Sequence, residues 1–316
     1  MSDILELINV IGLPGGRTPK HKTIIAPRKL LELARKNKVP LLFLKKINTL
    51  QREQTIYERR YTQFLQMLHF LATSFSRIGL HYTLIKTLKP FSYVPSDIDI
   101  LVERKKDLRK AVSRLREAGL KVSDEGKNET TLFSEKYTLN VDLYLELNVI
   151  DFIYLNKAHL FKHTFPKKIH ASEIWTLQPP AELVVVAAHA LYKEQMFTLS
   201  EFYTFIAYLH HIEEGKTIAS NTRTQIAYNL MLHFVYELLK CLTTERQRSK
   251  EGRVSNRVLA EKLKLPQKVS FNLLLKAFWE KIFDKYAFVT FFEGLKHLLT
   301  PNFYKNLISH TYRETY

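Results

Sequence analysis

The chain of 316 residues contains a single cysteine, Cys241. An intrachain disulfide is therefore impossible, and a zinc site built from several cysteines is excluded. No uninterrupted apolar run reaches the roughly 18 residues that a membrane-spanning helix needs, and the first residues lack the pattern of a secretory signal peptide. These absences predict a cytoplasmic protein with no membrane partner, in which Cys241 is a core residue rather than a nucleophile.

Acidic residues are scarce relative to basic ones. The chain has 48 lysines and arginines against 31 aspartates and glutamates, which gives a net charge of +17. Such an excess favours a polyanionic partner, such as nucleic acid or a nucleotide-bearing substrate. The alternative is a solubilising surface of a heat-adapted protein, but glutamate normally rises together with lysine in such proteins.

Only one turn is rich in glycine, Gly12-Leu-Pro-Gly-Gly16. It lacks the Gly-Lys-Ser/Thr ending that a phosphate-binding P-loop requires, so we interpret it as a plain loop. The sequence also contains no internal repeat and no low-complexity tract.

Two aspartates, Asp97 and Asp99, open a stretch that alternates as a half-buried strand does. On such a strand both carboxylates project from the same face. Neighbouring carboxylates repel each other, and burying them is costly unless a cation lies between them. A divalent ion with oxygen ligands, above all Mg²⁺, is the usual cation. The alternative is that Asp97 is a turn residue after Pro95-Ser96 and that Asp99 is exposed at an edge.

A third carboxylate lies on a second alternating stretch, residues 138–147. Asp142 shares its face there with Asn140, Tyr144 and Glu146. If this strand pairs near residues 97–102, Asp142 can face the first two aspartates. Three converging carboxylates can form a two-metal site, which holds a triphosphate and activates a hydroxyl for in-line attack.

Four pieces of sequence follow one another along the chain: Ile85-Lys86-Thr87, Asp97-Ile98-Asp99-Ile100-Leu101-Val102, Val141-Asp142-Leu143-Tyr144 and Ala187-Ala188-His189-Ala190. Together they resemble the nucleotidyltransferase superfamily over roughly residues 81–210, and within it the uncharacterised nucleotidyltransferase-like proteins of prokaryotes. The resemblance implies that Asp97, Asp99 and Asp142 are catalytic and bind Mg²⁺ or Mn²⁺. It also implies an NTP substrate, such as ATP, whose nucleoside monophosphate is transferred to a hydroxyl.

One position departs from the superfamily pattern. The preceding strand usually ends in Gly-Ser or Gly-Gly, whose backbone amides hold phosphate, whereas Thr87-Leu88 stands at that place here. A side chain keeps the backbone from approaching phosphate as closely as glycine permits. We expect Lys86, Thr87 and Ser96 to contact the nucleotide, and a hydroxyl of Ser92 or Ser96 to take the place of the missing backbone amides. The departure also supports an alternative function, a catalytically silent protein that binds nucleotide or RNA.

The periodicity of apolar residues predicts helices at 27–36, 55–78 and 105–118, and strands at 81–87, 120–122 and 130–134. This order is typical of an α+β fold, a nucleotidyltransferase-like small mixed sheet with helices on one face. We expect residues 1–78 to form an N-terminal helical segment on the core, 79–155 the α+β core, and 156–316 a helical C-terminal domain.

The helix predicted from Pro180 to Met196 carries His189 and Lys193 at i and i+4, on one face. We expect this pair to contact nucleotide phosphates across the domain cleft. The alternative is that His189 is a core histidine whose hydrogen bonds are all made within the protein. The neighbouring His210 and His211 point apart on a helix, so they do not form a metal cluster.

Basic residues also gather at 105–116 and at 246–257, where Arg246, Arg248 and Arg253 lie. With the net charge, they favour RNA, such as tRNA, as the acceptor; a protein hydroxyl (as in toxin-like nucleotidyltransferases) or a small molecule come next. Residues 255–266 resemble the start of a helix-turn-helix, but the following helix is apolar like a core element. A nucleic-acid-binding regulator that uses this helical region is the second alternative function.

Overall fold

The computed structural model describes residues 3–14, 26–149, 152–169, 172–251, 265–284 and 287–288. The strands of its main sheet are β1 (Tyr82–Leu84), β2 (Asp97–Val102), β3 (Lys121–Glu125), β4 (Glu129–Ser134), β5 (Leu139–Tyr144), β8 (Thr164–Ile169) and β9 (Ser172–Leu177). They lie in the order β3-β4-β5-β2-β1-β9-β8. Strand β2 is parallel to β5 and β1 is parallel to β9, whereas the other pairs are antiparallel. The sheet is therefore mixed, as predicted.

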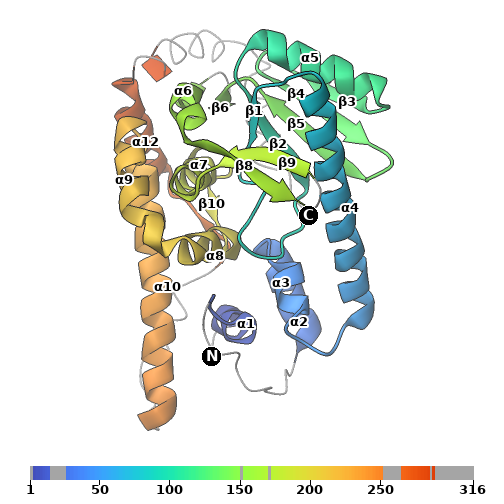
Figure 1. The fold of residues 1–316 in the computed structure, drawn as a ribbon. Coiled ribbons are helices and arrows are strands. Elements are labelled where there is room, and N and C mark those ends of the chain that lie inside the picture. The colour runs from blue at the N-terminus through green and yellow to red at the C-terminus, as the bar shows by residue number, and fades with distance from the viewer. Residues whose placement is uncertain are drawn as a thin grey trace, which may run out of the picture.

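Helices surround this sheet and form a further group beside it (Figure 1). The described helices are α1 (Asp3–Ile11), α2 (Pro27–Lys36), α3 (Pro40–Leu44), α4 (Gln51–Arg77), α5 (Lys105–Glu117), α6 (Lys157–Leu160), α7 (Pro179–Tyr192), α8 (Leu199–Ala207), α9 (Ile212–Asn221), α10 (Gln225–Glu251) and α12 (Phe271–Ile282). Two short ladders pair β6 (Leu147–Val149) with β7 (Phe152–Leu155), and β10 (Met196–Phe197) with β11 (Gln267–Lys268). The predicted α+β class with a helical C-terminal region is confirmed.

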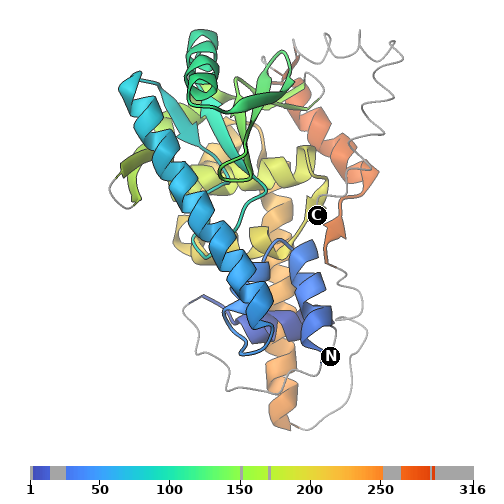
Figure 2. The same cartoon turned by 90° about the vertical axis from the view of Figure 1, so that its right-hand side faces the viewer.

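One face of the sheet is covered by α4 and α5. Ile98, Ile100 and Val102 of β2 alternate toward this face, because successive side chains of a strand point to opposite sides. They share one apolar cluster with Leu68 of α4 and Leu115 of α5. In Figure 2 the long helix α4 extends from the sheet down to α1–α3. The apolar stripes that predicted these two helices are thus the surfaces that bury the central strands.

The opposite face of the sheet is also covered. Leu101 of β2 and Tyr144 of β5 lie on the face of the aspartates, yet both are buried in a second apolar cluster with α7 and α1–α3. The expectation of helices on one face only was wrong. Its physical reason is that this face carries charge at Asp97, Asp99 and Asp142 but is apolar further along the strands, at Leu101 and Tyr144.

The sheet also continues past residue 155, where the α+β core was expected to end. Strands β8 and β9 form a hairpin, and Leu84 of β1 pairs with Thr176 of β9. The edge strand β8 contains Pro166 and lysines, a polar composition that edge strands tolerate and that hides the alternation of a strand. The helical region therefore begins at α7, and the division into three domains stays a prediction.

Helix α7 is buried along nearly its whole length, from Pro180 to Tyr192. It packs against α8, α9, α10 and β7, and a helix that is apolar on all sides is typical of an interior position. Prolines at its first turn suit a helix start, where the backbone N–H groups have no partner within the helix. Two polar side chains of this helix, Glu182 and His189, are consequently held in place by tight packing of the surrounding elements.

The remaining helices, α8–α10 and α12, pack around α7 (Figure 1). None of the described helices is both long and apolar enough to cross a bilayer. Most of the stretch that resembles a helix-turn-helix, residues 255–266, lies outside the described residues, as do Arg253 and the side chains of Arg246 and Arg248.

Candidate active site

Asp97 and Asp99 lie on β2, and Asp142 lies on the neighbouring parallel strand β5. In the observed register Asp99 is the direct partner of Asp142. Each aspartate offers a carboxylate oxygen such that the three oxygens lie within 4.8 Å of one another. Because alternate residues of a strand share a face, the pairing of β2 with β5 is what brings the three carboxylates together.

Burial makes this cluster electrostatically unfavourable on its own. Asp99 is 3% exposed, and Asp97 and Asp142 are half-buried. Burial raises the pKa of Asp97, and the Asp99 charge raises it further. The pKa of Asp99 and of Asp142 is also raised, chiefly by burial and then by the other carboxylates, whereas Lys86 lowers that of Asp99. A cation between the carboxylates would relieve both the desolvation and the repulsion.

The donor set fits a divalent cation. Asp99 Oδ1 is buried and accepts no well-aligned hydrogen bond from any described residue. The Asp142 carboxylate is oriented by the Thr131 hydroxyl, which donates to Oδ1 at 2.8 Å, and by the Tyr144 hydroxyl at 3.3 Å from Oδ2. Carboxylate oxygens are the ligands that Mg²⁺ and Mn²⁺ prefer.

Lys86 brings a positive charge into the cluster. It follows β1 with a φ of 45°, in a three-residue turn closed by the hydrogen bond from Thr87 N–H to the Ile85 carbonyl. Its Nζ lies 2.9 Å from Asp99 Oδ1, in an ion pair that lacks the angle of a good hydrogen bond. Burial opposes the charge on Lys86, but Asp99 and Asp97 outweigh it and raise the pKa of the ammonium group. Lys86 is therefore a fixed cation beside the carboxylates.

Thr87 and Ser96, the other residues expected to contact nucleotide near the strand ends, differ in their surroundings. Thr87 is 1% exposed, and its hydroxyl accepts a hydrogen bond from Asp99 N–H at 2.9 Å. Ser96 is exposed and directly precedes Asp97. Thr87 thus holds the backbone of an aspartate, whereas Ser96 is exposed next to Asp97.

His189 and Lys193, the pair expected at the end of α7, both lie at the site. His189 Nε2 is 3.1 Å from Lys86 Nζ, and its Nδ1 is 3.3 Å from the Tyr154 hydroxyl. Burial and the Lys86 charge lower the pKa of His189 to about 3, so the imidazole is neutral near pH 7. Lys193 Nζ donates to the Tyr144 hydroxyl at 3.2 Å and lies 4.8 Å from the centre of that ring.

Two further charged residues extend the site and were not predicted. Lys38, in the turn between α2 and α3, forms an ion pair of 3.2 Å with Glu194 Oε2. Glu194 Oε1 lies 3.2 Å from His189 Nε2. Charged and polar groups therefore continue from Asp99 through Lys86, His189 and Glu194 to Lys38. No local pattern marks Lys38, because its partner is 156 residues away.

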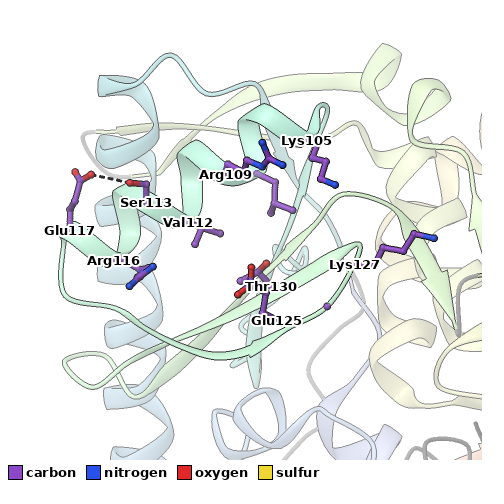
Figure 3. A pocket seen from close by; sticks show the side chains of 11 residues that line it. Lys105, Arg109, Val112, Ser113, Arg116, Glu117, Glu125, Lys127 and Thr130 are labelled. Atoms are coloured by element: carbon purple, nitrogen blue, oxygen red, sulfur yellow. Dashed lines mark hydrogen bonds between the residues drawn. The ribbon is translucent and has the colours of Figure 1, made fainter. Parts of the chain in front are cut away.

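A separate groove lies between α5 and the hairpin of β3 and β4 (Figure 3). Its charged lining residues are Lys105, Arg109, Arg116, Glu117, Glu125 and Lys127. Thr130 of β4 also lines it, while the next residue, Thr131, points to Asp142 from the other face. The groove is thus on the α5 side of the sheet, away from the three aspartates.

The mixed sheet places two aspartates of one strand beside a third on a parallel neighbour. Residues 94–241 match the sequence model of a family described as "Uncharacterised nucleotidyltransferase". The resemblance predicted from the four sequence pieces is thereby confirmed. The matched stretch contains all three aspartates and α7, and it ends at Cys241.

A solved structure is also similar to the chain, an antigenic nucleotidyltransferase-like protein from Paracoccidioides brasiliensis. Its sequence identity is 9% and its TM-score is 0.38, over 58% of this chain and 93% of the other. No curated protein sequence matches the chain.

Proposed function

We propose that this protein is a metal-dependent nucleotidyltransferase that transfers a nucleoside monophosphate from an NTP to a hydroxyl. The observation that carries the proposal is the convergence of Asp97, Asp99 and Asp142, with ligand oxygens within 4.8 Å of one another. Asp99 Oδ1 is also buried and receives no well-aligned hydrogen bond from the described residues. The family matched by residues 94–241 supports the same class of reaction.

In this reaction the acceptor oxygen attacks the α-phosphorus of the NTP. A new phosphorus–oxygen bond forms, the bond from the α-phosphorus to the β-phosphate oxygen breaks, and pyrophosphate leaves. Divalent metal held by the three aspartates would supply charge stabilisation for the triphosphate. We assign the proton of the acceptor hydroxyl to Asp142, because it lies across from the Asp97–Asp99 pair and is half-buried.

Lysines around the carboxylates supply positive charge for the triphosphate. Lys86, Lys38 and Lys193 each partly offset the rise in the pKa of Asp97 that burial and the Asp99 charge cause. All three are partly exposed, with 16–28% of the side-chain surface accessible. Phosphate oxygens in front of Asp97 would thus meet several ammonium groups, the usual arrangement for binding a polyphosphate.

We further propose RNA, such as tRNA, as the acceptor. The net charge of +17 supports it, together with the exposed lysines and arginines along α5, at Lys105, Lys106, Arg109, Lys110 and Arg116. A protein hydroxyl or a small molecule is the alternative acceptor. A catalytically silent protein that binds nucleotide or RNA is the alternative function, and the Lys86–Asp99 ion pair at the metal position favours it over a regulator built on the helical region.

The test is incubation of the full chain with each α-labelled NTP, Mg²⁺ or Mn²⁺, total RNA and total protein. We expect label in RNA that depends on the metal. Label in protein would show that the acceptor is a protein hydroxyl rather than RNA. Absence of label in any fraction, with nucleotide binding retained, would favour the silent alternative.

Two variants separate chemistry from folding in this assay. Asp142→Asn is expected to abolish transfer, because the amide neither holds a metal ion well nor accepts a proton. Asp124→Asn makes the same change at an exposed residue of β3 on the same sheet. It should transfer label at the rate of the unaltered protein.

A further inference from the structure

The ammonium group of Lys86 lies where a cation is expected for the carboxylates. Its Nζ is 2.9 Å from Asp99 Oδ1, the buried oxygen that receives no well-aligned hydrogen bond from the described residues. A metal ion on this oxygen would lie at about 2.0–2.1 Å if it were Mg²⁺, and paired metal ions lie about 3.5–4 Å apart. The ammonium group and a second metal ion would thus compete for the same oxygen.

Lys86 is also held in this place by the buried helix α7. Its backbone N–H donates to Glu182 Oε2 at 3.0 Å, and its Nζ lies 3.1 Å from His189 Nε2. Glu182 is 5% exposed and His189 is 8% exposed, and both lie on α7. The backbone of Lys86 and the end of its side chain are therefore fixed by the same rigid element. Moving the ammonium group away would leave two buried polar groups without this partner, which is unfavourable.

We propose that Lys86 is a resident cation of this site, so that the three aspartates bind one divalent ion rather than two. The inference rests on the proposed metal-dependent function and deepens it. Charge balance supports it, because one divalent ion and one ammonium group together neutralise three carboxylates. Lys86 pairs with Asp99, the most buried of the three, and the half-buried Asp97 and Asp142 remain accessible to the ion.

The number of bound ions tests this directly. The full chain is titrated with Mn²⁺ alone, by equilibrium dialysis and by electron paramagnetic resonance, which distinguishes an isolated Mn²⁺ from a spin-coupled pair. We expect one ion per chain and an uncoupled spectrum. Lys86→Met removes the charge and keeps most of the side-chain volume, and it should bind two ions with a coupled spectrum.

Lys193→Met is the matched control, because it removes the same charge from a lysine that contacts the Tyr144 hydroxyl rather than an aspartate of the cluster. It should still bind one ion. Lys86→Arg keeps the charge and should also bind one, and circular dichroism checks that each variant is folded. If Lys86→Met does not fold, the number of Mn²⁺ ions bound by the unaltered protein and by Lys86→Arg still tests the proposal.

The outcomes separate the two proposals. Two coupled ions in the unaltered protein, or one ion in a folded Lys86→Met variant, would overturn the role of Lys86 while the metal-dependent function stands. No bound ion in the unaltered protein would overturn both proposals and favour the silent alternative. Label transfer in the earlier assay is an independent readout of the function.

Discussion

The hydroxyl of Thr87 accepts a hydrogen bond from the backbone N–H of Asp99 at 2.9 Å, between two residues that are both almost fully buried. The Ile85 N–H donates to the Asp99 carbonyl at 3.1 Å, so both backbone groups of Asp99 are held by the end of β1. A glycine at residue 87 would leave the Asp99 N–H without this acceptor. The threonine therefore serves to fix an aspartate, at the position where the resemblance implied a glycine that approaches phosphate.

Replacing Thr87 tests this role. Thr87→Val keeps the shape of the side chain but leaves a buried N–H without its acceptor, which should reduce the free energy of unfolding by about 1–3 kcal/mol. Thr87→Ser retains the hydroxyl and should lose less. Urea denaturation of the two variants measures the difference, and equal losses for valine and serine would show that the hydrogen bond does not contribute.

Neutralising the aspartates should have opposite effects on stability at two positions of β2. Asp97→Asn removes a half-buried charge whose pKa is raised by burial and by Asp99, so the metal-free protein should be as stable or more stable. Asp99→Asn removes the partner of the Lys86 ammonium group, so it should destabilise, by roughly 1–3 kcal/mol after allowing for the partial exposure of Lys86.

Urea denaturation in EDTA checks this contrast, and Mn²⁺ titration shows whether each variant still binds the ion. Both variants should bind Mn²⁺ poorly, although only one is destabilised. Equal destabilisation by the two changes would contradict the assignment of the buried ion pair to Asp99 rather than to Asp97.

Much of the site follows from local sequence. The alternation around Asp97 and Asp142 fixes which side chains share a face, and the pairing of β2 with β5 then needs only the correct register. The ion pair of Lys38 with Glu194 has no such signal, since it depends on how α2 and α3 pack against α7. The same limit applies to the buried face at Leu101 and Tyr144, which shows only when helices distant in sequence are placed over it.

The buried, neutral His189 predicts an acid-sensitive fold. Burial and Lys86 lower its pKa from 6.5 to about 3. Below pH 6.5 the unfolded chain takes up a proton here that the folded protein does not, so stability is lost as the pH falls from about 6.5 toward 3. The loss from this group is roughly 1.4 kcal/mol for each pH unit in that window.

Comparison with His189→Gln isolates this contribution from that of other titrating groups. The stability of the unaltered protein relative to His189→Gln should decrease between pH 7 and pH 4.5, as measured by urea denaturation. His210→Gln, at an exposed histidine, should show no such change. A difference between the unaltered protein and His189→Gln that stays constant with pH would mean that His189 takes up a proton in the folded protein as it does in the unfolded chain.

If RNA is the acceptor, its binding should depend steeply on salt. Each phosphate neutralised by the protein lowers log K by about 0.7–0.9 per log unit of salt. Lys106, Arg109 and Lys110 are exposed on α5, so reversing their charges together should flatten the slope by about 2–2.7. Nucleotide binding should not change, because α5 covers the face of the sheet opposite the aspartates.

A matched control reverses three exposed arginines of α4, Arg52, Arg59 and Arg60, and so changes the net charge by the same amount. Filter binding of tRNA between about 50 and 200 mM salt gives the slopes. If RNA phosphates contact α5, only the α5 variant flattens the slope. Equal effects of both variants would mean that the net charge acts without a defined RNA surface. A flat slope in the unaltered protein would shift the acceptor to a protein or a small molecule.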